Sequence, residues 1–159
     1  MNNQNNDWNV DSKPVTAIKN NAFENKEEIK TVVIPSSMVT IGEYAFSMCI
    51  KLKQIIIPNN VTTISDYAFY KCDALESVTF LGNVTTIGAK AFSGTIELDW
   101  VIIPSTLTSF GESVFYNASA DTVIRFRGTS AQWGAIQNHN DSTIVYYENN
   151  GKIIYNYQH

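Results

Sequence analysis

The residues that could do chemistry are few, and they are not arranged for catalysis. The only histidines are His139, in a polar stretch, and His159, the last residue. Ser/His/Asp and Cys/His catalytic sets both need a histidine placed as the base. The sequence also lacks a GxxxxGK[ST] or GxGxxG phosphate loop and any His/Cys pair with zinc-ligand spacing. We therefore predict no catalytic residue, no metal site and no cofactor.

Composition and charge exclude several classes of partner. The chain has 159 residues, 44% hydrophobic and 16% charged, so it can bury a core without disulfides or metal. Its net charge of -4 has the wrong sign for neutralising phosphates, which argues against a nucleic-acid partner. No apolar run approaches the roughly 18 to 20 residues that cross a bilayer, so we expect no membrane insertion. The first thirty residues also lack the apolar stretch of a secretory signal, so either the chain stays inside the cell or a leader is missing from this sequence.

A repeat of 23 residues organises the chain and must position whatever site exists. Phenylalanines recur at this spacing at Phe23, Phe46, Phe69, Phe92 and Phe115. A second column holds Ile18, Ile41, Ile64, Ile87 and Phe110. One such unit has only half a core, so units bury their apolar residues by stacking. The spacing predicts a solenoid of about five coils over residues 15–127, with the phenylalanines inside.

One unit illustrates the local structure expected of every coil. Residues 52–57 alternate between inward apolar and outward side chains, which predicts a short strand. Pro58 ends the strand, and Asn59 and Asn60 supply the turn. Residues 61–64 predict a second short extended piece. Residues 66–70 then predict a single helical or 3₁₀ turn that buries Ala68 and Phe69.

Both ends depart from the repeat and are predicted to be caps. Residues 1–14 are polar, with Trp8 available to cover the first coil. In residues 128–159, Thr129 or Ser130 is expected to cap a short helix. Residues 143–148 and 152–157 alternate about an Asn-Gly step, which predicts a β-hairpin. The first arm of the hairpin either extends the solenoid sheet or the hairpin stands apart.

Segments such as LKQIIIPNNVTTISDYAFYKC and LDWVIIPSTLTSFGESVF resemble the BspA-like leucine-rich repeat, a 23-residue variety found on bacterial and protist surface proteins. The resemblance covers residues 15 to about 127. It implies a curved right-handed α/β solenoid with short parallel strands on its concave face and short helical turns opposite. It also implies a role in adhesion or protein binding and no catalysis. Leu81 departs from the pattern, because Pro35, Pro58 and Pro104 stand at the equivalent position, and Arg127 marks the last coil as degenerate.

The two cysteines, Cys49 and Cys72, are 23 residues apart and so fall at the same point of adjacent coils. Parallel stacking aims both Cβ atoms the same way, which disfavours a disulfide. Buried free thiols are the expected state.

The outward positions of the predicted strands give the candidate binding face. Such strand-bearing faces are the extended binding surfaces of repeat arrays. One outward column runs through Thr31, Gln54, Ser77, Trp100 and Val123, and the next runs through Val33, Ile56, Thr79, Ile102 and Arg125. The predicted contact residues are Trp100, Ile56, Val33, Ile102, Gln54 and Arg125. The alternative is that β-branched residues stand there for strand propensity alone and that Trp100 merely covers its neighbours.

A second patch on the convex side holds Tyr44, Tyr67, Tyr70 and Tyr116. Half-buried packing is the more ordinary interpretation, although exposed tyrosines can also stack on sugars. The leading hypothesis is a non-enzymatic module that binds a protein, either a host protein or a cell-surface protein, and that acts in adhesion at the cell surface. The alternatives are a glycan-binding module and an intracellular or virion-associated partner protein.

Overall fold

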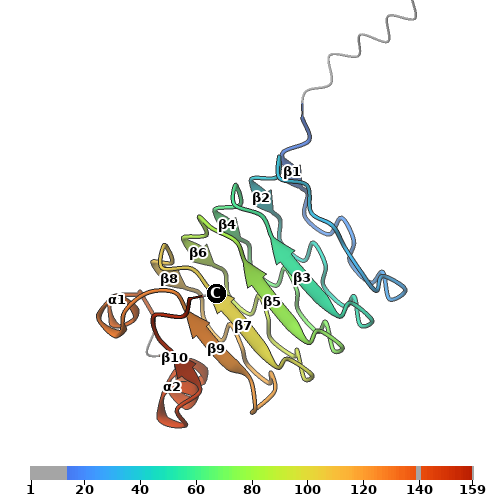
Figure 1. Cartoon of the computed structure of the whole chain (residues 1–159). Coiled ribbons are helices and arrows are strands. Elements are labelled where there is room, and N and C mark those ends of the chain that lie inside the picture. Colours follow the sequence, from blue (N-terminus) through green and yellow to red (C-terminus); the bar gives the residue numbers. More distant parts are fainter. Residues whose placement is uncertain (1–13, 139–140, 159) are drawn as a thin grey trace, which may run out of the picture.

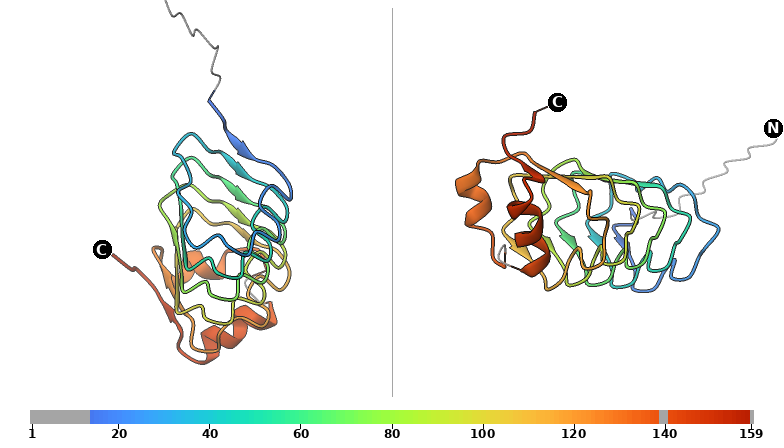
Figure 2. Two further views of the ribbon diagram at one scale, coloured as in Figure 1. Left: turned by 90° about the vertical axis from the view of Figure 1, so that its right-hand side faces the viewer. Right: turned by 90° about the horizontal axis from the view of Figure 1, so that it is seen from below.

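The computed structural model describes residues 14–138 and 141–158. The chain winds into a solenoid whose coils each contribute a strand to one or both of two parallel sheets (Figures 1 and 2). The short-strand sheet consists, in spatial order, of β1 (Ala17–Ile18), β2 (Thr40–Ile41), β4 (Thr63–Ile64), β6 (Thr86–Ile87) and β8 (Ser109–Phe110). The long-strand sheet consists of β10 (Ile153–Ile154), β9 (Val123–Phe126), β7 (Trp100–Ile103), β5 (Ser77–Phe80) and β3 (Gln54–Ile57). This is the predicted leucine-rich-repeat solenoid of about five turns.

Strand register reproduces the repeat of the sequence. Ile41 pairs with Ile64, and Ile64 pairs with Ile87, so each step between coils equals one 23-residue unit. The long strands keep the same step. In β3 the side chains alternate, with Ile55 and Ile57 buried and Gln54 and Ile56 exposed. Equivalent residues therefore lie directly beside one another.

The core contains a column of parallel phenylalanine rings. The ring centres of Phe46 and Phe69 are 5.3 Å apart, and those of Phe69 and Phe92 are 5.2 Å apart. Phe46, Phe69, Phe92 and Phe115 are buried, as predicted. The prediction is wrong for Phe23, which is 40% exposed because its ring packs on Phe46 from one side, at the first described coil. The position of Trp8, expected to cover that coil, lies outside the described residues.

The turns opposite the long strands differ from the prediction, because they contain neither α-helix nor 3₁₀-helix. Each coil makes two successive turns in which the third residue has a positive φ, as at Tyr67 (φ 56°) and Lys71 (φ 52°). Ala68 N–H donates to the carbonyl of Ser65 within the first turn, whereas Phe69 N–H donates to Ala91 in the next coil. Because of the residues with positive φ, every second backbone N–H in these turns donates to the next coil. The successive hydrogen bonds of a helix within the coil therefore do not form.

The first part of the C-terminal cap agrees with the prediction. Helix α1 (Ser130–Gly134) begins at Thr129, whose hydroxyl accepts a hydrogen bond from Gln132 N–H. The Gln132 side-chain oxygen accepts a hydrogen bond from Thr129 N–H, which completes a capping box. Trp133 and Ile136 are buried against the last coil.

The predicted hairpin is wrong. Residues 142–149 form helix α2 (Ser142–Asn149), capped by Asp141, and Ile144 and Tyr147 face the core one turn apart. Gly151 has φ 65° and its N–H donates to Glu148, so the Asn-Gly step ends a helix and does not connect two strands. The chain then adds β10 to the long-strand sheet, parallel to β9. The sheet is thus extended by residues 153–154, and not by residues 143–147.

Candidate binding face

The described residues offer no metal cluster. Among residues 14–138 and 141–158, no group of three His, Cys, Asp or Glu side chains could hold a metal ion. No helix in these ranges is long and apolar enough to cross a membrane. Both histidines, His139 and His159, lie outside the described residues.

The two cysteines are buried free thiols, as predicted. The Cys72 thiol donates to the carbonyl of Phe46 at 3.1 Å, and the Cys49 thiol donates to the carbonyl of Phe23 at 3.2 Å. Burial raises the pKa of both thiols. A protonated, buried thiol is a poor nucleophile, so these residues pack the core and have no reactive role.

The structure aligns the candidate contact residues as the repeat predicted. Gln54, Ser77, Trp100 and Val123 form one row across the outer face of the long-strand sheet, and Ile56, Thr79, Ile102 and Arg125 form the next. Thr31 bridges to Gln54, so Val33 lies beside Ile56. The residues share one face, but they do not form one site.

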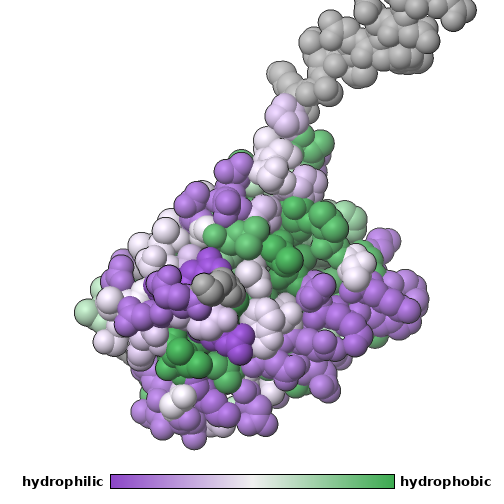
Figure 3. Space-filling view, in the orientation of Figure 1, coloured by the Kyte–Doolittle hydropathy of each residue, from purple (hydrophilic) through white to green (hydrophobic). Residues whose placement is uncertain are grey.

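The N-terminal part of this face is an apolar patch formed by Val33, Ile56 and Leu81. These side chains are 92%, 51% and 46% exposed. They border a hollow of about 190 Å³, to which Val32, Ile34, Gln54 and Pro58 also contribute. Figure 3 shows the continuous hydrophobic area over this part of the face, around β3. The sequence analysis did not include Leu81 among the candidate contact residues, although its replacement of the proline found at positions 35, 58 and 104 was an available signal.

Ile102 does not belong to the exposed surface. It is only 2% exposed, so the expectation that its side chain is exposed on this face is wrong. Arg127, just after β9, reaches back across the end of β7 and donates to the carbonyls of Phe80 and Leu81 at 3.3 and 3.4 Å. The long arginine side chain thus lies over the strand that carries Ile102.

Trp100 and Arg125 lie at the other end of the face and are half-buried. The guanidinium carbon of Arg125 is 5.2 Å from the centre of the Trp100 ring and 5.3 Å from that of Tyr157. Both distances fall within cation–π range. Tyr157 belongs to the C-terminal segment after β10. Its backbone N–H donates to the carbonyl of Phe126 at 3.0 Å, which brings the residue to this end of the face. No pattern in the sequence indicated that the tail returns to this face.

The tyrosines of the opposite side are mostly packed. Tyr44 and Tyr67 are half-buried, and their rings are stacked 4.7 Å apart with an interplanar angle of 8°. Tyr70 is half-buried against the edge of Tyr67, whereas Tyr116 is 59% exposed. The packing interpretation is confirmed for three of the four tyrosines, and Tyr116 is the exception.

Comparison with known families agrees with this geometry. Residues 4–132 match the model of the BspA type leucine rich repeat region, in six copies. The chain belongs to this family. Such repeats are typical of protein-interaction modules. A comparison with curated proteins found no significant match.

Solved structures of leucine-rich repeat proteins share the fold. The leucine rich repeat protein of T. pallidum is 31% identical with a TM-score of 0.69, over 73% of this chain and 54% of that protein. A leucine rich cell surface protein from Faecalibacterium prausnitzii is 28% identical with a TM-score of 0.51, over 77% of this chain and 28% of that protein. A leucine-rich repeat protein from Bacteroides ovatus is 23% identical with a TM-score of 0.52, over 88% of this chain and 33% of that protein. The chain therefore spans about half the length of the first relative and about a third of the others.

Proposed function

We propose that this BspA-type protein is a non-enzymatic module that binds a protein partner through the outer face of the long-strand sheet. The observation that carries the proposal is the apolar patch of Val33, Ile56 and Leu81. Monomeric proteins seldom leave contiguous apolar area exposed beside a hollow unless another surface covers it. Strand propensity accounts for Ile56 in β3, but it does not account for Val33 or Leu81, which lie outside the strands.

The surroundings of the patch suit a protein partner. The hollow is lined by aliphatic side chains and Pro58, with the Gln54 amide at its edge. An aliphatic or aromatic side chain of the partner would fill the hollow, while Gln54 supplies a hydrogen bond at the rim. Further along the same face, Trp100 and Arg125 supply residue types enriched at interfaces. The cation–π contact holds both side chains in place, so less conformational entropy is lost when a partner binds.

We place the module at the cell surface, in an adhesion role. The supporting observations are the family and the F. prausnitzii relative, which is described as a cell surface protein. Finding the complete reading frame tests this location. A secretion signal upstream of residue 1 agrees with the proposal, and its absence favours the intracellular alternative.

The binding face is tested with a partner captured on the immobilised chain from extracts of neighbouring cells, identified by mass spectrometry and then purified. Val33→Asp and Ile56→Asp place a charge in the patch and should each weaken binding at least about 10-fold. Trp100→Ala should weaken binding about 30-fold, which corresponds to about 2 kcal/mol. Val39→Asp is the matched control, because Val39 is 41% exposed beside β2 on the other sheet.

Melting temperatures of the variants separate lost binding from lost fold. The proposal requires Val33→Asp and Ile56→Asp to melt like the wild type and to lose affinity, while Val39→Asp keeps it. Equal affinities for all three aspartate variants would contradict the proposed face.

A further inference from the structure

A second hollow lies at the other end of the molecule, where helix α2 packs on the last coil. It encloses about 350 Å³, within the size range of small-ligand sites. The residues that matter here are Phe115, Tyr116 and Asn117 of the coil, and Ser142, Thr143 and Tyr146 of the helix. The hollow is distinct from the outer face of the long-strand sheet.

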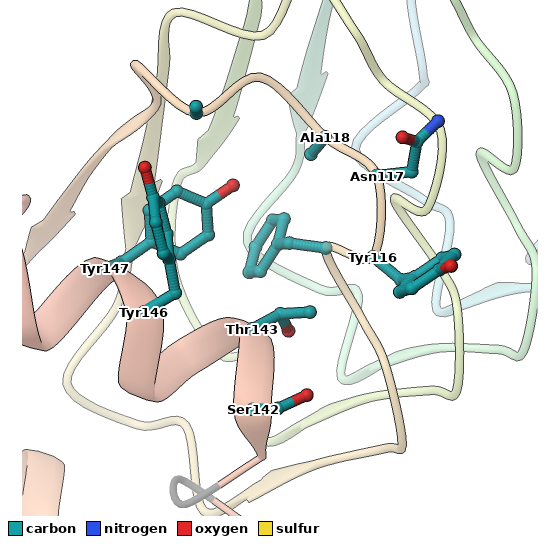
Figure 4. A pocket seen from close by; sticks show the side chains of 9 residues that line it. Tyr116, Asn117, Ala118, Ser142, Thr143, Tyr146 and Tyr147 are labelled. Carbon is teal, nitrogen blue, oxygen red and sulfur yellow. The ribbon is translucent and has the colours of Figure 1, made fainter.

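Aromatic rings form its walls and its base. In Figure 4, Tyr116 of the coil and Tyr146 of helix α2 stand on opposite sides of the hollow. Phe115 also lines it. Tyr116 and Tyr146 are 59% and 44% exposed, whereas Phe115 is 1% exposed. Tyr147 braces the base, since its ring packs edge-on against Phe115 and its hydroxyl donates to the carbonyl of Ser119 at 3.0 Å. The exposed rings of Tyr116 and Tyr146 therefore border a base formed by the packed side chains of Phe115 and Tyr147.

Four polar side chains around the rings, those of Tyr116, Asn117, Ser142 and Tyr146, are neutral and have no hydrogen-bond partner among the described residues. None of the residues that line the hollow carries a charge. Within residues 14–138 and 141–158, no hydrogen bond forms to the side chains of Asn117 and Ser142 or to the hydroxyls of Tyr116 and Tyr146. The Ser142 hydroxyl points from α2 toward the segment that carries Tyr116, and Asn117 lies at the rim beside Tyr116 (Figure 4). These groups are free to exchange hydrogen bonds with a ligand.

We propose that this pocket binds a neutral sugar ring at the end or within the chain of a glycan. One face of a pyranose ring presents C–H groups, which pack on the electron-rich face of a tyrosine. Its hydroxyl groups project from the edge and can both donate and accept, which matches amide and hydroxyl partners. The ring and the pocket therefore agree in shape, polarity and charge.

Other ligand classes fit the pocket less well. A phosphate or carboxylate ligand needs a cation or a cluster of N–H donors, and no Lys or Arg lines the hollow. A purely apolar side chain would bury the Ser142 hydroxyl and the Asn117 amide without hydrogen bonds, and each unsatisfied group costs about 1 to 3 kcal/mol.

The two walls are fixed relative to each other before any ligand arrives. Asp141, which caps α2, accepts a hydrogen bond from the backbone N–H of Ser113 in the last coil at 3.0 Å. Ser113 precedes Phe115 by two residues, so this contact joins the two elements that form the pocket. A pre-formed site loses little entropy on binding.

Ligand-observed NMR and calorimetry on the whole chain test the proposal. The probes are the methyl glycosides of glucose, galactose, mannose, N-acetylglucosamine and N-acetylgalactosamine. N-acetyl-phenylalanine amide serves as the apolar probe. At least one glycoside should bind with a Kd of roughly millimolar strength or tighter, the range expected of a single ring. Tyr116→Ala and Tyr146→Ala should each weaken that binding at least about 10-fold, because each removes one stacking wall.

Two further variants sharpen the test. Asn117→Gly suits the positive φ of 54° at this position and removes the side chain with its amide, so it should weaken binding without lowering the melting temperature. Tyr44→Ala is the control, since Tyr44 lies on the same side of the solenoid and does not line the pocket. The proposal is overturned if no glycoside binds, if Tyr116→Ala and Tyr146→Ala bind as the wild type does, or if the apolar probe binds there more tightly than every glycoside.

Discussion

Asp141 and Ser113 join the C-terminal cap to the solenoid. One carboxylate oxygen of Asp141 accepts from the Ser113 backbone N–H at 3.0 Å, and the other accepts from the N–H and the hydroxyl of Thr143 at 3.0 and 2.6 Å. A single side chain thus caps α2 and fixes the helix to the last coil.

Asp141→Ala should lower the free energy of unfolding by about 1 to 2 kcal/mol, because it removes a helix cap and leaves two N–H groups without their partner. Urea titration measures the change. The control is Asp121→Ala, which removes a surface ion pair with Lys152 at 3.2 Å. That variant should change stability by less than about 1 kcal/mol. Similar losses for the two variants would show that Asp141 does not anchor the cap.

The same carboxylate predicts a pH dependence. Burial opposes its ionisation, but hydrogen bonds from the Thr143 hydroxyl, Ser113 N–H and Thr143 N–H outweigh burial and lower the pKa of Asp141 below its ordinary value of 3.8. The folded state therefore favours the charged form. Its stabilisation is fully present above the unfolded pKa and disappears as the pH falls through the lower, folded pKa. The stability difference between the wild type and Asp141→Asn should accordingly shrink between pH 6 and about pH 3, and a constant difference across that range would refute this assignment.

Phe69→Ala should lower the free energy of unfolding by about 3 to 5 kcal/mol, because the ring is packed between Phe46 and Phe92. Phe23→Ala is a matched control in the same column. Its ring packs on Phe46 from one side and is 40% exposed, so the loss should stay below about 2 kcal/mol. Denaturant titration compares the two, and equal losses would mean that the central ring gains nothing from its second neighbour.

Gly88 lies where two coils approach closely. A Cβ at this position would stand 2.7 Å from the carbonyl carbon of Ser65 in the preceding coil, so Gly88→Ala should destabilise the protein by about 1 to 3 kcal/mol. A Cβ added at Gly134, in α1, would meet no atom within 4 Å outside its own helix. Gly134→Ala should therefore leave stability unchanged or raise it by up to about 1 kcal/mol. Thermal melts of both variants check the contrast, which a neutral Gly88→Ala would contradict.

Cys49 and Cys72 should resist alkylation in the folded protein. Burial raises the pKa of both thiols, so little thiolate exists at pH 8 and access is blocked. Iodoacetamide labelling followed by mass spectrometry should be at least about 100-fold slower in buffer than in denaturant. A mass about two daltons lower without reductant than with it would reveal a disulfide and contradict the free-thiol state.

The repeat made much of the binding face predictable. A stacked coil places residue i beside residue i+23, so the rows through Gln54 and Ile56 can be obtained by counting along the chain. Which of those residues are exposed did not follow from the count. Ile102 and Ile56 occupy equivalent positions, yet Ile102 is 2% exposed and Ile56 is 51% exposed. The contribution of Tyr157 to the Trp100 end likewise depends on where the tail lies.

The sequence by itself determined the parts of the fold that repeat: the coil length, the inward columns and the end of a strand at proline, as in β3 and β7. It also indicated a short helix capped at Thr129 or Ser130. Only the tertiary structure decided the parts that occur once. Residues 143–147 alternate like a strand, but Asp141 caps a helix there and the last coil accepts Ile144 and Tyr147, so the segment is helical. The conformation of the turns also depends on tertiary contacts, because Phe69 N–H and its equivalents donate hydrogen bonds to carbonyls of the next coil. A local sequence pattern indicates which secondary structures a segment can form. The surface on which the segment packs then determines which of these structures is the most stable.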